Sequence, residues 1–145
     1  MKLLIVDARP EEKYAEILKE CRMRKIEVQI ETASIPARYA LNKDKDKEID
    51  GIIMDLELPL FAGESDMIEP GEGERLLRYI HKKEFKIPIL IFSQETTKVQ
   101  YPYVICKIRN WQNEKSKFFE FIKEVHIFKL QKGRLQWVVL FCIKK

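Results

Sequence analysis

Four polar residues in this sequence each follow a short apolar run, and together they could bind a divalent cation and a phosphoryl group. The runs are residues 2–6, 51–54, 87–92 and 103–106, and the residues after them are Asp7, Asp55, Ser93 and Lys107. Short β-branched runs separated by helical patterns predict buried parallel strands. Parallel strands end at one edge of their sheet, where ligands of open α/β sheets bind. We therefore expect two carboxylates, a hydroxyl and an ammonium to converge at that edge.

The segments between these residues predict one α/β domain built on a five-stranded parallel sheet. We expect strands over residues 2–6, 27–31, 51–55, 87–92 and 103–107. Apolar residues recur at helical spacing from residue 14 to residue 21, and Pro10 suits the first position of that helix. Further helices are expected over residues 36–42, from residue 73 or 74 onward, and over residues 114–128.

Three segments depart from a regular alternation of strands and helices. Residues 60–72 form a long loop that is rich in acids. Only 13 residues separate Ser93 from Lys107, which leaves room for one turn near residues 95–100 and predicts a fourth helix that is reduced or missing. After a turn at residues 131–134, residues 135–143 predict an extra C-terminal strand. That strand could extend the sheet, pair across a dimer or lead into another domain.

Length and composition bound the class of protein. The 145 residues suffice for one domain with its own core, and we expect residues 1–126 to form it, with 127–145 as the helix end and extra strand. The net charge of +4 is spread along the chain and gives no sign of nucleic-acid binding. Three distant cysteines fit a reducing compartment, and two histidines make a zinc site improbable. No apolar run approaches the roughly 20 residues of a membrane span. We therefore expect a cytoplasmic protein without membrane contact.

Residues 1–126 resemble the receiver domain of two-component response regulators. KLLIVDARPEE is similar to that family's first strand and acidic turn, and DGIIMDLELP to its phosphoacceptor strand. GEGERLLRYI is similar to the start of its third helix, while IPILIFSQ and VICKI resemble the strands that end in its hydroxyl and its lysine. The resemblance implies a flavodoxin-like three-layer sandwich.

The resemblance also implies a role for each polar residue. Asp55 would attack phosphorus as a carboxylate nucleophile and form an acyl phosphate. Asp7, Asp55 and the backbone carbonyl of Glu57 would hold Mg²⁺, which prefers oxygen ligands. Ser93 would donate a hydrogen bond to the phosphoryl group, and Lys107 would neutralise its charge. The phosphodonor would be a histidine kinase or another donor.

The sequence also departs from the family's pattern. Receivers normally carry two adjacent acids after the first strand, and here Ala8 replaces the second, which weakens the expected Mg²⁺ site unless Glu11, Glu12 or a loop acid compensates. Ile108 replaces the proline that follows the lysine, so the bond before it is expected to be trans. Val104 replaces the aromatic switch residue.

Two functions therefore remain open. The first is a receiver-like signalling domain that accepts a phosphoryl group on Asp55 with Mg²⁺, with no turnover beyond its own phosphorylation and dephosphorylation. The second is a pseudo-receiver that keeps the fold and binds a protein partner, or a second copy through its C-terminal helix and strand, without phosphorylation. A Mg²⁺-dependent phosphohydrolase is a weaker third hypothesis, since no general acid is evident.

Overall fold

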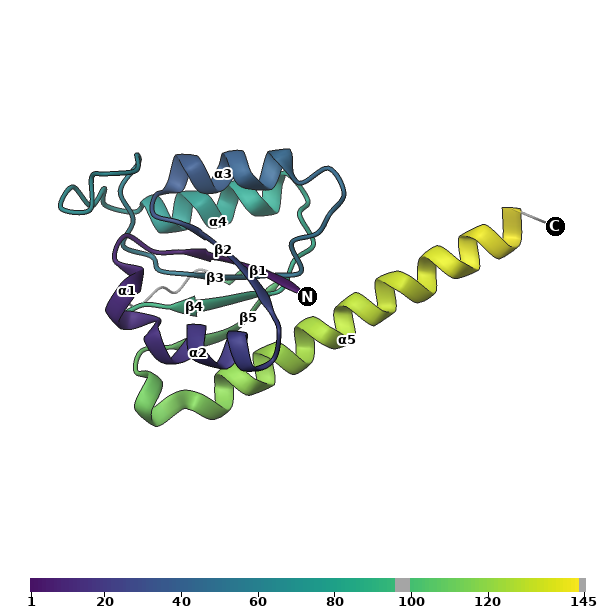
Figure 1. Ribbon diagram of the computed structural model, residues 1–145. Helices are drawn as coiled ribbons and strands as arrows, with labels where there is room; N and C mark the ends of the chain where they lie inside the picture. The colour runs from purple at the N-terminus through teal and green to yellow at the C-terminus, as the bar shows by residue number, and fades with distance from the viewer. Residues whose placement is uncertain (96–99, 144–145) are drawn as a thin grey trace.

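A parallel sheet lies between two layers of helices in the computed structural model of the protein (Figure 1). The structure describes residues 1–95 and 100–143, and the side chains of the last helix up to residue 132. Within these residues the sheet has five strands in the order β2-β1-β3-β4-β5. They are β1 (Lys2–Val6), β2 (Glu27–Glu31), β3 (Gly51–Met54), β4 (Ile89–Phe92) and β5 (Val104–Ile108). The predicted α/β class and the five-stranded parallel sheet are confirmed.

The helices cover both faces of this sheet. They are α1 (Pro10–Lys13), α2 (Ala15–Met23), α3 (Ser34–Lys43), α4 (Glu72–Lys82) and α5 (Trp111–Ile143). Helices α3 and α4 lie on one face, and α2 and the first half of α5 lie on the other (Figure 1). The single helix expected after β1 is two helices, because Tyr14 leaves the helical region with φ −102° and ψ 7°.

The strands bury side chains on both faces, as expected for a parallel sheet between helices. Leu4, Ile52 and other alternate residues pack against Leu76, Leu77 and Ile80 of α4. The residues between them pack against the opposite layer, which consists of α2 and the aromatic start of α5. The apolar residues of α2, α4 and the start of α5 therefore face the sheet.

The C-terminal segment is where the sequence-based prediction was wrong. The turn expected at residues 131–134 and the strand at 135–143 do not form, because α5 continues through both to Ile143 and projects from the domain (Figure 1). A short apolar run carries no period that separates a strand from a helix. Gly133 costs the helix only about 1 kcal/mol relative to alanine. A helix already nucleated by its packed first half can therefore continue through it.

Several predicted ends of strands and helices differ from the observed ones. Strand β4 begins at Ile89 rather than at residue 87, β3 ends one residue early, and β5 continues past Lys107 to Ile108. Helix α3 begins at Ser34, and α5 begins at Trp111 with a non-helical φ of −127° at Glu114. No helix lies between β4 and β5 among the described residues, and the single turn expected there falls mostly on residues 96–99, outside them. The described peptide bonds include no cis bond.

The long loop after β3 is fastened to α3 and α4. Backbone amides of Ser34 and Ile35 donate to the carbonyls of Pro59 and Leu60. Glu72, which is 1% exposed at the start of α4, forms an ion pair with Arg38 of α3 at 2.9 Å. A buried carboxylate needs such a partner, since burying it alone is costly. The loop therefore leaves the sheet edge along a fixed path.

Gly73 is required where α4 passes the end of β3. A Cβ atom at this position would lie 2.3 Å from the carbonyl oxygen of Leu56. We expect Gly73→Ala to lower the free energy of unfolding by about 1–3 kcal/mol, because the two backbones must separate. Urea denaturation measures this loss. Arg78→Ala, at an exposed site on the same helix, is the matched control and should change stability little; equal stability of both variants would contradict the close packing.

Candidate functional site

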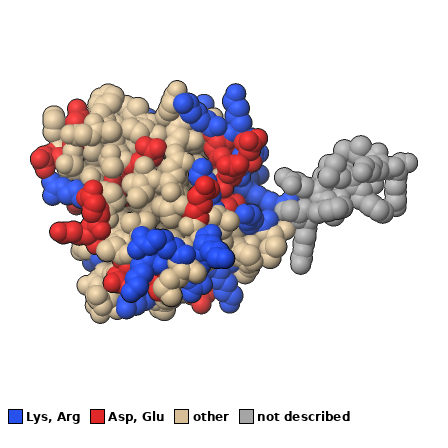
Figure 2. Space-filling model, in the orientation of Figure 1, with Lys and Arg blue, Asp and Glu red and all other residues tan. Residues whose placement is uncertain are grey.

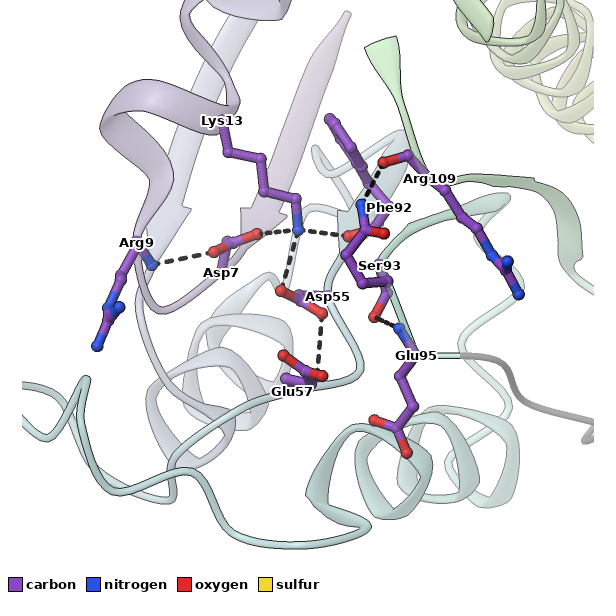
Figure 3. A network of polar contacts seen from close by, with 10 residues as sticks. Asp7, Arg9, Lys13, Asp55, Glu57, Phe92, Ser93, Glu95 and Arg109 are labelled. Carbon is purple, nitrogen blue, oxygen red and sulfur yellow. Dashed lines mark hydrogen bonds and ion pairs between the residues drawn. The ribbon is translucent and has the colours of Figure 1, made fainter. Parts of the chain in front are cut away.

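The carboxylates of Asp7 and Asp55 lie together at the carboxyl edge of the sheet (Figure 3). Asp7 follows β1, and its amide donates to the carbonyl of Glu31 in the neighbouring strand at 3.1 Å. The amide of Asp55 donates to the carbonyl of Val6 at 2.9 Å. These backbone bonds extend the strand pairing by one residue, so both carboxylates are held in place. Asp7 is only 3% exposed.

One ammonium group lies between the two carboxylates, and it belongs to Lys13. Its Nζ donates to Asp7 Oδ2 at 2.7 Å and to Asp55 Oδ2 at 3.0 Å. A third bond, at 2.5 Å, goes to the carbonyl oxygen of Phe92 at the end of β4 (Figure 3). An ammonium has three N–H donors. The side chain of Lys13 therefore joins the ends of β1, β3 and β4 with every donor in use.

The remaining carboxylate oxygens accept backbone hydrogen bonds. Asp7 Oδ1 accepts from the amide of Arg9, and Asp55 Oδ1 accepts from the amide of Glu57, each at 3.0 Å. Each acid thus closes a short turn with the residue two positions ahead. All four carboxylate oxygens have a partner within the chain. The sequence predicted the backbone carbonyl of Glu57 as a metal ligand. In the structure the amide of Glu57 donates to Asp55, and the Glu57 side chain is exposed.

Two aromatic rings form the floor beneath the ammonium. Lys13 Nζ lies 4.6 Å from the ring centroid of Phe92, within the range of cation–π attraction. Tyr14 packs edge-on against Phe92 with centroids 5.3 Å apart. The Tyr14 hydroxyl is fully buried and has no hydrogen-bond partner among the residues that the structure describes. Burial, together with the nearby charges of Asp7 and Asp55, raises its pKa well above the usual value.

Ser93 and Lys107 lie beside this centre, along a smaller pocket of about 230 Å³. Ser93 is 3% exposed, and its Oγ accepts a hydrogen bond from the amide of Glu95 at 3.2 Å. Lys107 is exposed and pairs with Ile91 one residue before the end of β5. The sequence placed Lys107 at the strand end, but Ile108 occupies that position opposite Phe92. Burial and nearby acids raise the pKa of Glu95, which lines the same pocket.

A wider pocket of about 840 Å³ opens over the two aspartates. Its wall combines the β1–α1 turn with Ser65 and Ile68 of the long loop. Arg9, on this wall, forms an ion pair with Asp66 of the same loop. Most of the ionisable side chains here are acidic, namely Asp7, Glu11, Glu12, Asp55 and Glu57, against Arg9 and Lys13. The pocket would therefore attract cations rather than anions.

The geometry does not fit the Mg²⁺ ion that this type of site implies. The ammonium of Lys13 lies within 3.0 Å of both carboxylates and would repel the ion. Ala8 supplies no further carboxylate. Among the described residues, no group of three or more His, Cys, Asp and Glu side chains is arranged to hold a metal ion.

Sequence reasoning missed Lys13. The available signal was a long basic side chain six residues after Asp7, in the first turns that follow the strand. Its direction depends on how the chain turns at Arg9 and Pro10, and the residue types do not give that direction.

The comparisons with known proteins agree with this fold. No family model matches the chain, and no curated protein matches it. Solved structures do match. A CheY-like response regulator receiver domain protein from Methanospirillum hungatei has 19% identity and a TM-score of 0.58, covering 86% of this chain and 95% of that one. The N-terminal domain of a response regulator/sensory box/GGDEF 3-domain protein from Carboxydothermus hydrogenoformans has 15% identity and a TM-score of 0.61, covering 93% and 99%.

This chain has the receiver-domain fold. A response regulator from Thermotoga maritima, solved with Mg²⁺ and BeF, matches at 18% identity and a TM-score of 0.56, covering 83% of this chain and 97% of that one. At such identities the likeness is one of fold, and the site must be interpreted from the residues present in this chain.

Glu114 lies near the start of α5, along the smaller pocket that Ser93 and Lys107 also line. Its Oε1 accepts from the amides of Arg109 and Asn110, and its Oε2 pairs with Lys117 at 2.8 Å. The hydrogen bond from Lys117 first, and then those from the backbone, lower the pKa of Glu114 from 4.5 to about 2. Because the folded pKa lies below the unfolded one, this carboxylate stabilises the fold fully above pH 4.5. That contribution is lost as the pH falls toward 2.

We therefore expect Glu114→Gln to have a shallower loss of stability over this acidic range than the wild type. Urea denaturation at a series of pH values measures the slope. Glu120→Gln on the same helix removes an equal charge and should follow the wild type. Identical slopes for the wild type and Glu114→Gln would contradict the assignment.

Proposed function

We propose that this protein is a receiver-like signalling module that works without phosphorylation of Asp55 and acts by binding a protein partner. A single observation supports this proposal: the oxygens of Asp7 and Asp55 that a catalytic cation would need are held by Lys13. Phosphoryl transfer depends on positioning and on neutralising charge around the transferred group. A site closed by its own lysine offers no open position for the metal that would do so.

The nucleophile itself is also engaged. Asp55 Oδ1 accepts the amide of Glu57, and Oδ2 accepts Lys13, so neither oxygen faces the pocket without a partner. Attack on phosphorus would have to come from an oxygen that already accepts one of these bonds. The receiver fold does not by itself imply phosphoryl transfer, since one fold hosts many functions.

Surface features support a role in protein binding. Large apolar side chains are exposed on the long loop and on α3, namely Ile35, Tyr39, Phe61, Met67 and Ile68. The loop is bonded to the start of α3 through the amides of Ser34 and Ile35, and apolar residues exposed in one contiguous area are typical of protein-interaction surfaces. Basic and acidic side chains are interspersed over the face drawn in Figure 2, so that face shows no single-sign patch for nucleic acid. No helix of the described residues is long and apolar enough to cross a bilayer.

Phosphoryl acceptance on Asp55 is the second candidate. The observation in its favour is that two carboxylates and Ser93 do lie at the same sheet edge, with Lys107 beside the serine. In this case Lys13 would leave the carboxylates when a donor and Mg²⁺ arrive. The phosphodonor would be a histidine kinase or a small acyl phosphate.

Incubation with acetyl phosphate and Mg²⁺, followed by intact-mass spectrometry, separates the two candidates. We expect the wild type to gain no mass, because the cation position is filled. Asp55→Asn is the control, and a receiver with two adjacent acids after its first strand serves as the positive reference. The proposal would be contradicted by a gain of one phosphoryl group that is stable in acid, labile in base and absent from Asp55→Asn. That result would establish the second candidate.

A further inference from the structure

We propose that Lys13 is the resident cation of this site, and that the oxygens it holds form a latent divalent-cation site that opens only when its ammonium leaves. This inference rests on the proposed function and deepens it, and it is tested by metal binding, which is measured separately from phosphoryl transfer. The oxygens are Asp7 Oδ2, Asp55 Oδ2 and the carbonyl oxygen of Phe92.

The first argument is the completeness of the ammonium's surroundings. Three donors meet three acceptors at 2.7, 3.0 and 2.5 Å. Two of the acceptors carry negative charge, and such charge-assisted bonds are the strong ones. The side chain is 24% exposed, while those of Asp7 and Asp55 are 4% and 14% exposed. A surface lysine with a chance contact would not be enclosed in this way.

The second argument is the chemistry of the three oxygens. Two carboxylates and a backbone carbonyl are the hard ligands that Mg²⁺ and Mn²⁺ prefer. Here they come from the ends of three different strands, which fixes their spacing by the sheet rather than by a loop. The same set would therefore suit a divalent ion if the lysine were absent.

The third argument is competition for these oxygens. Lys13 belongs to the same chain as these oxygens, so its binding to them is intramolecular and does not depend on concentration. Mg²⁺ sheds its waters reluctantly, and here it would also meet a positive charge at close range. Ala8 removes the carboxylate that would otherwise tip the balance toward the dication.

The position of Lys13 also has a structural consequence. Because it bonds to the ends of β1, β3 and β4, the ammonium holds these three ends at a fixed spacing without any ligand. In the proposed state this edge of the sheet is ordered without a bound metal ion. Loss of the ammonium would leave two carboxylates facing each other, and like charges in one site repel.

The decisive variant is Lys13→Met, which keeps most of the length of the side chain and removes its charge. Lys19→Met is the matched control, since it removes an equal charge from an exposed position on α2. Binding of Mn²⁺ is followed by the electron paramagnetic resonance of the free ion, and Mg²⁺ by competition. We expect Lys13→Met to bind Mn²⁺ at least about tenfold more tightly than the wild type and the control, because a unit charge beside the ion is gone. The double variant Lys13→Met/Asp55→Asn should lose this gain.

Thermal unfolding provides a second measurement on the same proteins. A ligand that binds only the folded state raises the melting temperature. Mg²⁺ should therefore stabilise Lys13→Met and leave the wild type and Lys19→Met unchanged. Equal Mn²⁺ affinity in all four proteins, or tight Mg²⁺ binding by the wild type, would overturn the inference.

A measurement on the wild type keeps the inference testable if Lys13→Met does not fold. The ¹⁵Nζ resonance of a hydrogen-bonded, enclosed ammonium exchanges slowly with water and can be observed. We expect one such lysine signal, absent from a Lys13→Arg variant, that does not move when millimolar Mg²⁺ is added. Loss or displacement of this signal by Mg²⁺ would show that the dication replaces Lys13 in the native protein, which contradicts the proposal.

Discussion

Two carboxylates at the ends of neighbouring strands repel each other when they lie side by side, and this constraint shapes the functional edge of the protein. Asp7 and Asp55 lie close together because β1 and β3 are adjacent and parallel. Their repulsion is offset by a bound ion, by a basic side chain or by a shared proton. In this chain the ammonium of Lys13 balances them and also closes the end of β4.

The rest of the site follows from that contact. The short helix α1 and the break at Tyr14 direct Lys13 toward the sheet edge, and the Phe92 ring lies beneath it. The long loop, pinned through Glu72 and Arg38 and through Arg9 and Asp66, forms the far wall of the acidic pocket. The receiver fold is thus preserved around a centre whose cation is covalently part of the chain. Fold and chemistry are separable properties, so the fold alone does not assign the chemistry of this centre.

The elements that could be predicted are those whose signal is local. Residues 2–6 and 27–31 were predicted as strands and are β1 and β2, and Leu76, Leu77 and Ile80 face the core as their spacing indicates. The run at residues 135–143 was predicted as a strand and is helical, because its apolar residues give no period and the preceding helix continues into it. The end of β5 was misplaced by one residue, which is enough to change where Lys107 stands relative to its neighbours.

The sequence by itself determined that Asp7, Asp55 and Ser93 follow strands of one parallel sheet, because apolar runs and their spacing can be identified from the residue order alone. It also determined that Ala8 leaves one acid fewer than the family's pattern. Only the tertiary structure decided which cation meets these acids. That choice depends on the direction of the chain through Arg9, Pro10 and Tyr14 and on distances between β1, β3 and β4. The spacing of the strands arises from contacts between residues far apart in the sequence, such as Leu3 with Gly51 and Ile52 with Ile89, which no local pattern encodes.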